Sequence, residues 1–424
     1  MAVNIILLIK EVNMSYIKIE KAIQEDYDEV IHLANYVFSM VRSPIDFPAI
    51  LPKLYKREYF MDGITYIIRE NGRIIAVTGA YPIKIEFPDG DALHGRGIGM
   101  VAVHPNCRSR GYMKELMIEA LDDMKKDGIS FSCLGGRRQR YETYGYTHAG
   151  SNYSFSVNED NIHHTLGRDR KNNLNIKLVN SDDEKTLDQI HALHEIKSVR
   201  MYRNREKLFD ILSSWKAKVF SIWEGDNFEG YLIYRPATHD ISEINMKNIS
   251  RIGEAVDLIL RQRRDNYFTE APVLGSIQIM AGPNETEKLA ALSGLAETCS
   301  LSNAFQFAIL DFKKFTEPFL KHKVRQCRIE NGSFAFNINN HAKEYNAYYS
   351  NYEIKEKLLL RSGFNGAEIS DNTSEKSLLE LNTVQAVRFL FSPFSDHSFP
   401  AIRENLFLQS ILPFPLFFEN VDGV

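Results

Sequence analysis

Hydrophobic positions in the first third of the chain change spacing in an order that predicts a sheet with helices packed on it. Residues 97–103 form an apolar run closed by a proline, which is typical of a buried strand. From 113 to 124 the apolar residues fall at helical spacing, so we expect a helix that begins near Gly111 and buries one face. A second apolar run over 129–134 predicts a neighbouring strand.

Earlier residues extend this pattern toward the N-terminus. Residues 16–20 alternate as a strand, and residues 30–38 follow a helical period. Two strand patterns flank the dipeptide Asn71-Gly72, which predicts a hairpin. Strands, a helix and a further strand in this order predict a mixed α/β sheet with helices on its faces.

The same order of patterns recurs downstream. Strand and helix patterns follow one another from 174 to 244, and a long helical pattern covers 252–260. We therefore interpret residues 157–300 as a second copy of the first domain. The strand-to-helix junction of this copy, residues 244–248, contains neither arginine nor glycine, so we expect it to be a structural wall or part of an acceptor site.

The last third of the chain, residues 301–424, is rich in strand patterns. Residues 333–338 alternate cleanly, a helix is expected through 384–391, and a helix from 312 to 320 is expected to be disturbed by Pro318. Alternating aromatic side chains here favour core packing over the lining of a lipid cavity, because a half-buried sheet needs such side chains. These aromatic residues are Phe305, Phe307, Phe312, Phe315, Phe334 and Phe336.

The turn after the first buried strand combines features that suit a bound anion. Several backbone N–H groups meet there beside the positive end of the helix dipole, and Arg108 and Arg110 add two cations. These features fit a pyrophosphate, although a plain turn with solvated arginines contains the same residue types. The turn has neither the glycine-lysine pattern of a nucleoside-triphosphate loop nor the glycine pattern of a dinucleotide site.

The residues of this turn resemble a known family. The series Val101-x-Val103-x-Pro105-x-x-Arg108-x-x-Gly111 is similar to the acetyl-coenzyme-A loop of the GNAT N-acetyltransferases. Met113 departs from that loop, because it stands where a small residue is usual. This departure, with Phe87-Pro88-Asp89-Gly90 upstream and Tyr144-Gly145-Tyr146 downstream, resembles the enhanced-intracellular-survival branch of the family.

The resemblance implies an α/β (α+β) fold of tandem GNAT-like mixed sheets flanked by helices, followed by a C-terminal sterol-carrier-like α+β domain. Residues 14–156 would be the acetyltransferase domain, 157–300 a degenerate GNAT-like domain and 301–424 the sterol-carrier-like domain. Residues 1–13 read as an N-terminal extension. The close motif match covers about residues 65–150, and the remainder matches in layout alone.

The resemblance also assigns the binding of acetyl-coenzyme A. Backbone N–H groups would hold the pantetheine arm and polarise the thioester in the strand, and the loop would hold the pyrophosphate. The strand residues are Val101, Ala102 and Val103, and the loop residues are Arg108, Ser109, Arg110, Gly111, Tyr112 and Met113.

Acyl transfer to an amine further needs an acid for the departing thiolate and a base for the amine. Tyr141 matches the catalytic tyrosine of the branch, and Tyr144 is the near alternative for this role. A simpler interpretation is that Tyr141 is an aromatic residue packed in the core. Arginines 137, 138 and 140, just before it, would contact the coenzyme's phosphates or disfavour a polycationic acceptor. In the branch the C-terminal carboxylate assists deprotonation, so the carboxylate of Val424 is the candidate base. The C-terminal tail that carries this carboxylate is apolar and contains prolines, so we expect it to pack into the protein.

Alternatives to this role of the tail stay open. Asp422 or Glu419 could supply the carboxylate in place of Val424. A tail packed for stability alone, or in contact with a second copy in a homo-oligomer, is an equal alternative.

Composition narrows the classes of partner and compartment. Length suggests about three domains. A formal net charge of −4 gives no reason to expect nucleic-acid binding and slightly favours cationic acceptors. The four cysteines are scattered without ligand spacing, so we expect free thiols, no metal, and a reducing, cytoplasmic environment. Cys107 has no base visibly paired with it, so we expect no catalytic role for its thiol. The sequence contains no apolar run of about 18 residues, so we expect no membrane span.

Together these features predict an acetyl-coenzyme-A-dependent N-acetyltransferase. The acceptor would be a primary amine of a small molecule, aminoglycoside-like or a polyamine. The alternatives are a non-catalytic coenzyme-A- or lipid-binding protein and an enzyme that acetylates lysine side chains of proteins.

Overall fold

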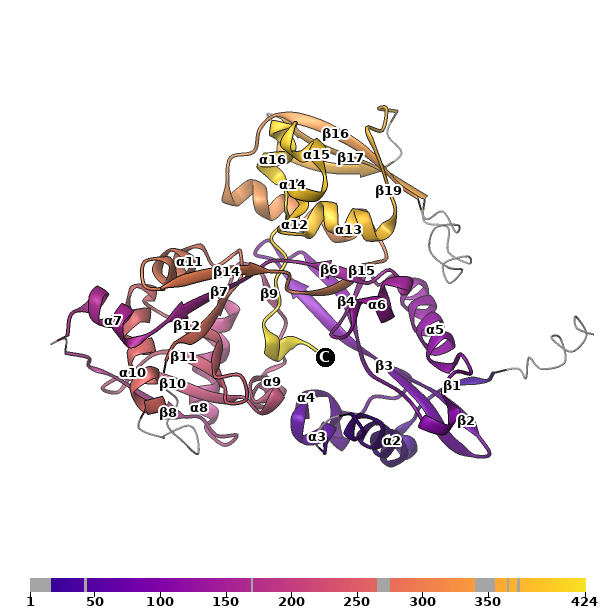
Figure 1. Ribbon diagram of the computed structural model, residues 1–424, viewed down its shortest axis with the longest axis horizontal. Helices are drawn as coiled ribbons and strands as arrows, with labels where there is room; N and C mark the ends of the chain where they lie inside the picture. The colour runs from indigo at the N-terminus through magenta and orange to yellow at the C-terminus, as the bar shows by residue number, and fades with distance from the viewer. Residues whose placement is uncertain are drawn as a thin grey trace, which may run out of the picture.

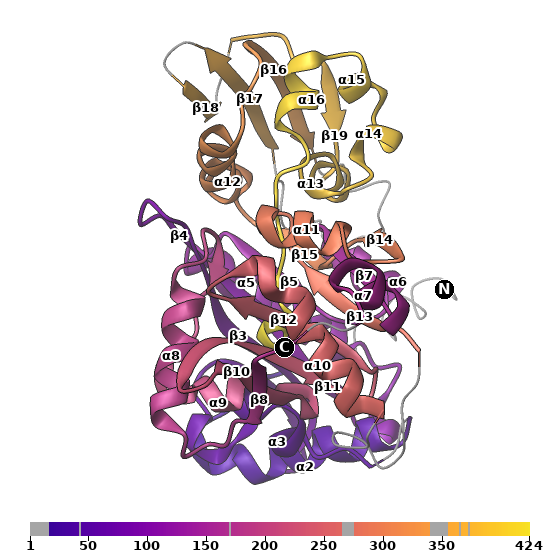
Figure 2. The ribbon, with the colours of Figure 1, turned by 90° about the vertical axis from the view of Figure 1, so that its left-hand side faces the viewer.

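The computed structural model describes residues 17–41, 44–168, 171–264, 275–339, 355–363, 366–371 and 374–424. The expected extension, residues 1–13, lies outside this described part. Two mixed sheets with their helices lie side by side, and a third unit lies against the region where they meet (Figure 1). The view turned by 90° shows this third unit stacked at one end of the pair (Figure 2).

The first sheet has the strand order β1-β2-β3-β4-β5-β15-β6, with β9 paired to β3. One face packs on α2, α3 and α4, and the other packs on α5. The strand, helix and strand expected over 97–134 are confirmed as β4, α5 and β5. The bounds are β1 Ile19–Lys21, β2 Thr65–Glu70, β3 Arg73–Glu86, β4 Ala92–Val103, β5 Phe131–Leu134, β6 Thr147–Ala149, β9 Arg200–Met201, β15 Phe305–Ile309, α2 Tyr27–Ser39, α3 Phe47–Ile50, α4 Pro52–Tyr55 and α5 Tyr112–Lys126.

The second sheet repeats the first. Its order, β8-β10-β11-β12-β13-β7-β14, corresponds strand by strand to that of the first sheet, and β12 runs parallel to β13 as β4 does to β5. This correspondence confirms the predicted duplication. The bounds are β7 Asn152–Val157, β8 Leu174–Leu178, β10 Lys218–Glu224, β11 Asn227–Arg235, β12 Asp240–Met246, β13 Ile277–Ala281, β14 Thr298–Ser302, α7 Glu159–Leu166, α8 Glu184–Glu195, α9 Leu208–Leu212, α10 Ile252–Arg264 and α11 Thr286–Ser293.

The two copies exchange one strand each. β7 follows β6 in the chain but pairs with β13 and β14 of the second sheet. β15 follows β14 but lies between β5 and β6 of the first sheet. The sheets therefore differ from the expected boundaries, which placed β7 in domain 14–156 and β15 in domain 301–424. Periodicity predicts that a strand forms, but it does not identify the sheet in which the strand pairs.

The third unit is a sheet of order β18-β17-β16-β19 covered by helices. The expected break at Pro318 is wrong, because α12 runs through it from Phe312 to Gln326. The carbonyl that loses its partner to a proline belongs to the residue four positions earlier. Here that residue is Lys314, on the exposed side of the helix, where water can serve the carbonyl. The bounds are β16 Gly332–Asn339, β17 Lys355–Gly363, β18 Gly366–Asp371, β19 Leu379–Leu381, α13 Thr383–Phe391, α14 Ser395–Ser398, α15 Pro400–Arg403 and α16 Leu406–Ile411.

The aromatic side chains of this region form a core. Phe307, Phe315 and Phe336 are fully buried in one cluster with residues of the first sheet. Phe315 packs its ring against that of Phe131 on β5, with the centroids 4.9 Å apart. This packing joins the third unit to the first sheet. Among the described residues, no helix is long and apolar enough to cross a membrane.

Candidate active site

The first sheet opens between β4 and β5. β4 pairs with β3 as far as Val103, but its parallel pairing with β5 joins only residues 95–97 to residues 131–133. A bulge interrupts β4 near Met100, which has a φ of 54°. Some backbone N–H and C=O groups of residues 98–103 therefore face the opening, where an extended ligand could pair with them as a strand would.

The loop that follows β4 brings backbone donors to one end of this opening. Ser109 and Gly111 have φ values of 64° and 84°, so the chain turns sharply just before α5 begins at Tyr112. Successive residues in such conformations aim their N–H groups into one concavity. No side chain caps this end of α5, so the donors of its first turn stay available for an anion.

The cations of the loop differ in their partners. Arg110 donates from Nη1 to Glu70 Oε1 at 2.9 Å, at the end of β2, whereas Arg108 has no ion pair with a described residue. Both side chains are exposed. Cys107 is buried, and burial followed by the charge of Glu70 raises the pKa of its thiol. A thiol in that state is a poor nucleophile. The loop is therefore equipped to bind an anion, and Cys107 fits the incidental role expected for it.

Tyr141 ends a short helix, α6 (Arg138–Tyr141), beyond the open end of β5. The residue is 7% exposed, and its ring lies against Gly136, where an added Cβ would be 2.8 Å from Tyr141 Cε2. Burial raises the pKa of the Tyr141 phenol, and Arg140 offsets this in part. The hydroxyl is therefore protonated at neutral pH and can act as a proton donor. Tyr144 is buried to the same extent.

Two buried contacts support the Tyr141 segment, and sequence reasoning missed both. Gln306 on the exchanged strand β15 donates from Nε2 to the carbonyl of Gly136 at 2.6 Å. Tyr146, whose ring centroid lies 6.4 Å from that of Tyr141, donates its hydroxyl to Ser132 Oγ at 2.8 Å. Because β15 comes from far along the chain, no local pattern could have indicated its contribution.

The arginines that precede Tyr141 are not equivalent. Arg138 Nη1 lies 2.8 Å from Glu142 Oε2, and Glu142 also pairs with Arg388 of α13 at 2.8 Å. Arg138 therefore takes part in a link between the first sheet and the third unit. Arg137 and Arg140 are exposed.

On the face of β4 opposite α5, three glycines alternate and give room to other side chains. A Cβ added to Gly95 would lie 2.4 Å from the Phe131 ring, and one added to Gly99 would lie 2.8 Å from the Tyr55 hydroxyl. One added to Gly97 would lie 2.6 Å from Cγ1 of Val424. The last residue of the chain therefore packs at the point where β4 leaves β5.

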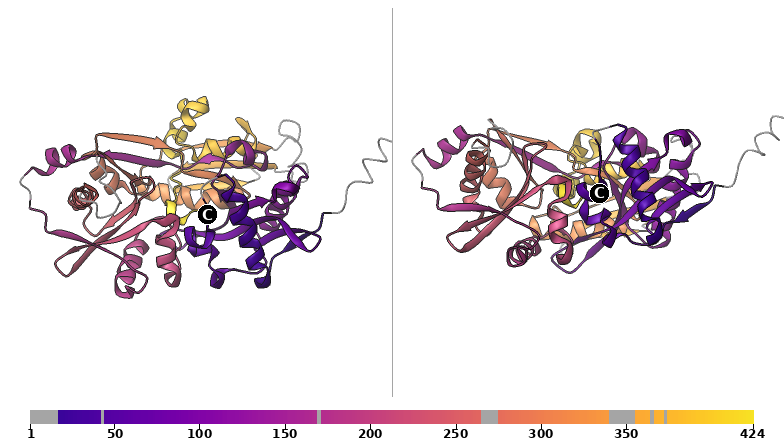
Figure 3. Two further views of the ribbon diagram at one scale, coloured as in Figure 1. Left: turned by 60° about the horizontal axis from the view of Figure 1, so that its bottom comes forward. Right: turned by 90° about the horizontal axis from the view of Figure 1, so that it is seen from below.

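The tail reaches this point between the first and second units, and the marked C-terminus lies there in Figures 1 and 3. Lys53 of α4 donates from Nζ to the carbonyl of Val421 at 2.5 Å. Arg203, just after β9, holds the Asp422 carboxylate with two bonds, Nε to Oδ1 at 2.9 Å and Nη2 to Oδ2 at 2.8 Å. The tail is thus held by both units.

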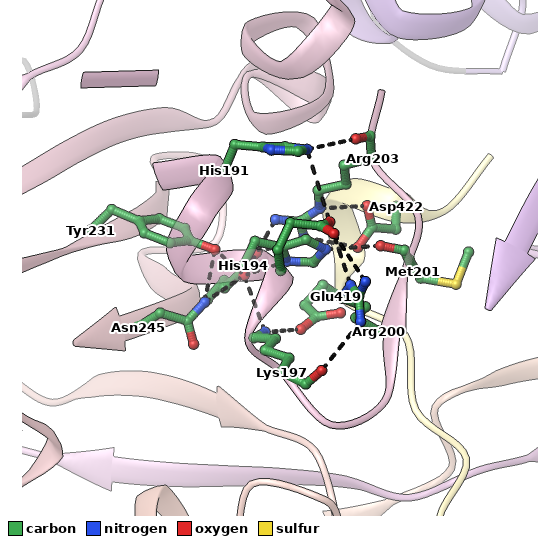
Figure 4. Close-up of polar contacts among 12 residues, drawn as sticks. His191, His194, Lys197, Arg200, Met201, Arg203, Tyr231, Asn245, Glu419 and Asp422 are labelled. Atoms are coloured by element: carbon green, nitrogen blue, oxygen red, sulfur yellow. Dashed lines mark hydrogen bonds and ion pairs between the residues drawn. The ribbon is translucent and has the colours of Figure 1, made fainter. Parts of the chain in front are cut away.

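A buried network of charges surrounds these contacts (Figure 4). Arg203 is fully buried and also binds Glu243 of β12, with Nη2 2.7 Å from Oε2. Glu243 accepts further bonds from the Tyr231 hydroxyl at 2.6 Å and from Lys197 at 3.2 Å, and Lys197 also pairs with Glu419 of the tail. Opposite charges and hydrogen bonds thus compensate each buried ion.

The charges in this network shift the pKa values of its members. Burial alone would raise the pKa of Glu243, but Arg203 and Lys197 together hold it well below its usual value. Burial lowers the pKa of Lys53 to about 8, against the opposing effect of Asp422. Glu243 is therefore ionised, and the pKa of Lys53 lies closer to neutrality than that of an exposed lysine.

The loop and Tyr141 were predicted as site residues and the tail was predicted to dock inward, whereas Lys53, Arg203 and Glu243 were not predicted. The tail residues Glu419 and Asp422 were a signal for their existence, because an acidic residue in an inward-docking apolar tail requires a cationic partner. The sequence did not indicate which cation pairs with each tail carboxylate, since Lys53 and Arg203 lie in different domains.

Residues 18–149, which include β1 to β6 and the loop before α5, match the family model described as Acetyltransferase (GNAT) domain. A search of curated protein sequences finds no match for this chain.

Solved structures share the whole architecture. A probable N-acyltransferase from Enterococcus faecalis V583 is similar with a TM-score of 0.66 at 16% identity, over 95% of this chain and 99% of that one. A GCN5-related N-acetyltransferase from Kribbella flavida gives 0.62 at 13% identity, over 96% and 98% of the two chains. Eis1 from Mycobacterium abscessus gives 0.60 at 13% identity, over 94% and 99%. At such identities the likeness establishes the fold alone.

Proposed function

We propose that this protein is an acetyl-coenzyme-A-dependent N-acetyltransferase that acetylates a primary amine of a small molecule. The observation that carries the proposal is the opening between β4 and β5, which has an uncapped helix N-terminus at one end and the last residue of the chain beside it. A thioester of a long nucleotide-linked thiol fits such a site, because its diphosphate and its amide-rich arm need backbone donors in a line.

The residues proposed for the coenzyme divide into two groups. Arg108, Ser109, Arg110, Gly111, Tyr112 and Met113 would surround the pyrophosphate. Val101, Ala102 and Val103 would pair with the pantetheine arm along the unpaired side of β4. The positive φ values of Ser109 and Gly111 support the first group, and the short β4–β5 pairing supports the second.

The reaction proposed is attack of a neutral amine on the thioester carbonyl. The carboxylate of Val424 would take the proton of the acceptor ammonium, with Asp422 or Glu419 as substitutes. The new C–N bond forms as the oxyanion is stabilised by backbone N–H groups near the bulge of β4. The C–S bond then breaks as Tyr141 gives its phenolic proton to the departing thiolate, and the second proton lost by the nitrogen returns Tyr141 to its phenol form.

Of the three carboxylates proposed as base, the inner two are already engaged. Asp422 is held by Arg203 with two bonds, and Glu419 is paired with Lys197. A carboxylate held in such a pair is not free to approach an acceptor amine. This favours Val424 as the base.

The acceptor is proposed by class. Aminoglycoside-like molecules and polyamines carry several amines, and the slightly negative net charge of the protein suits such cationic acceptors.

We also propose that the third unit, a β18-β17-β16-β19 sheet with helices, is the sterol-carrier-like domain.

Turnover with a panel of amines tests the proposal. Release of free thiol from acetyl-coenzyme A would be followed with aminoglycosides, polyamines, simple amines and a lysine peptide, for the unchanged protein and for Tyr141→Phe. We expect turnover with a small amine and its loss in the variant. Turnover with the peptide alone would favour protein lysine acetylation. Thermal stabilisation by coenzyme A without any turnover would favour a binding protein and overturn the proposal.

A further inference from the structure

Each of the last four residues of the chain is recognised by a different element. The contacts combine a backbone hydrogen bond, an ion pair and two close approaches at glycine backbone. They are Val421 with Lys53 of α4, Asp422 with Arg203, Gly423 with the Phe305 ring of β15, and Val424 with Gly97 of β4. A tail that serves only to fill space needs no such set, since apolar packing is enough for that purpose.

The polar members of this set fix the register of the tail. The Arg203 guanidinium and the Asp422 carboxylate meet in the two-bond geometry that a shift of one residue would break, because such a shift moves the backbone by about 3.3–3.6 Å. Lys53 takes the carbonyl of the preceding residue from the opposite side. The free carboxylate two residues beyond Asp422 is therefore held at one place beside β4.

The surroundings of Arg203 show that it is held firmly. It is fully buried, and it shares its guanidinium between Asp422 of the tail and Glu243 of β12. The Tyr231 hydroxyl holds Glu243 in turn. The Asp422 contact is thus connected, through Glu243, to buried residues of the second sheet.

We infer that Arg203 and Lys53 are positioning residues for acetyl transfer, which set the C-terminal carboxylate at the opening between β4 and β5. This inference rests on the proposed function. It assigns a task to the second, degenerate copy: its sheet holds the arginine that places a group working in the first copy. Neither residue contacts the reacting atoms; both act through the tail.

Two measurements on the full-length protein test this role. Release of Val424 by a carboxypeptidase, followed by mass spectrometry, reports whether the tail is docked. The pH dependence of kcat and of KM for an amine acceptor reports whether the carboxylate still works as a base. The variants are Asp422→Asn, which keeps the size of the side chain but removes the charge, and Lys53→Met. Arg205→Met is the control, because Arg205 lies near Arg203 in sequence but pairs with Glu184 and Asp188 on the surface.

We expect Asp422→Asn and Lys53→Met each to speed the release of Val424 by about tenfold or more and to lower kcat by a similar factor. KM for acetyl-coenzyme A should stay within about twofold, and the acidic limb of the kcat profile should move in both variants. Lys53→Arg, which can still donate to the Val421 carbonyl, should restore at least part of the loss. Arg205→Met should change none of these values.

The outcomes separate the inference from the proposed function. If the unchanged protein acetylates no amine, the proposed function fails, and with it the role in positioning a base. If the protein is active but both variants leave carboxypeptidase release and the pH profile unchanged, the inference is overturned while acetyl transfer stands. If Asp422→Asn does not fold, the decision rests on Lys53→Met, which removes one hydrogen bond.

Discussion

The side chain of Val424 lies against the backbone of Gly97, so the end of the chain meets the middle of β4. An added Cβ on Gly97 would be 2.6 Å from Cγ1 and 2.7 Å from Cγ2 of Val424, which is closer than carbon atoms can pack. Gly97 is also the last residue of β4 that pairs with β5. The chain terminus therefore lies where the sheet opens, and glycine is the residue that permits it.

Replacing this glycine should displace the tail. We expect Gly97→Ala to cost about 1–3 kcal/mol of unfolding free energy through overpacking, and to lower kcat for amine acetylation by about tenfold or more. Affinity for coenzyme A, measured by calorimetry, should fall less than kcat, because the added methyl group lies on the face of β4 opposite α5. Gly363→Ala in β17 is the control, since its added Cβ meets no heavy atom within 4 Å. A Gly97→Ala variant with full activity would show that the position of Val424 is unimportant.

Removing the hydroxyl of Tyr141 should affect chemistry without affecting coenzyme binding. We expect Tyr141→Phe to lower kcat by about 10²-fold or more, the usual size of a lost general acid. Burial raises the pKa of this phenol, so the protonated acid persists to higher pH than that of a free tyrosine, whose pKa is near 10. The alkaline loss of kcat due to Tyr141 should therefore occur above about pH 10 in the unchanged protein.

A matched substitution controls for loss of a tyrosine hydroxyl elsewhere. Tyr153→Phe in β7 changes a residue of the second sheet, so its kcat should equal that of the unchanged protein. Should Tyr144→Phe, and not Tyr141→Phe, abolish turnover, the acid would have to be reassigned to that neighbour.

Local patterns predicted most elements of the fold. The apolar run before Pro105 became β4, the helical spacing after Gly111 became α5, and the Asn71-Gly72 pair became the turn between β2 and β3. These signals are local, because periodicity and turn chemistry depend on neighbouring residues. The duplication could be predicted for the same reason, because the order of local strand and helix patterns repeats along the chain.

Contacts between distant segments were not predicted. The exchange of β7 and β15 and the partnership of Gln306 with Gly136 depend on which sheet a strand joins, and the sequence of a strand does not encode its neighbour. The pairing of Arg203 with Asp422 is of the same kind. The tail itself was predicted to dock inward from its apolar and proline residues, but its partners required the structure.

The conformation of Gly111 leads to a prediction for coenzyme binding. Gly111 has a φ of 84° with open space around it, so an alanine there meets no clash but is strained by about 1–2 kcal/mol. Relief of that strain would turn the N–H groups of the loop away from the anion. We expect Gly111→Ala to weaken binding of coenzyme A by about tenfold or more, as measured by calorimetry.

Gly72→Ala is a matched control for that variant. Gly72 has a φ of 78° and also has no heavy atom within 4 Å of an added Cβ, but it lies in the β2–β3 hairpin. The two variants should lose similar unfolding free energy, and only Gly111→Ala should lose affinity. Equal affinities in the two variants would argue against pyrophosphate binding by this loop.

Burial of Lys53 predicts how stability depends on pH. Its pKa falls from 10.5 in the unfolded chain to about 8 in the folded protein, chiefly through burial. Between these values the unfolded chain binds more protons than the folded protein, so the contribution of Lys53 to stability rises with pH. Below pH 8 the lysine is charged in both states, and the cost of burying the charge is fully present. The gain across the window is at most about 3 kcal/mol.

Urea unfolding at a series of pH values checks this sign. The unfolding free energy of the unchanged protein minus that of Lys53→Met should increase from about pH 8 to about pH 10.5 and be level below it. Lys18→Met, which removes an exposed lysine, is the control against which this increase is judged. A Lys53→Met difference that is flat, or that decreases with pH, would mean that the ammonium of Lys53 is solvated or fully compensated by Asp422 in the folded protein.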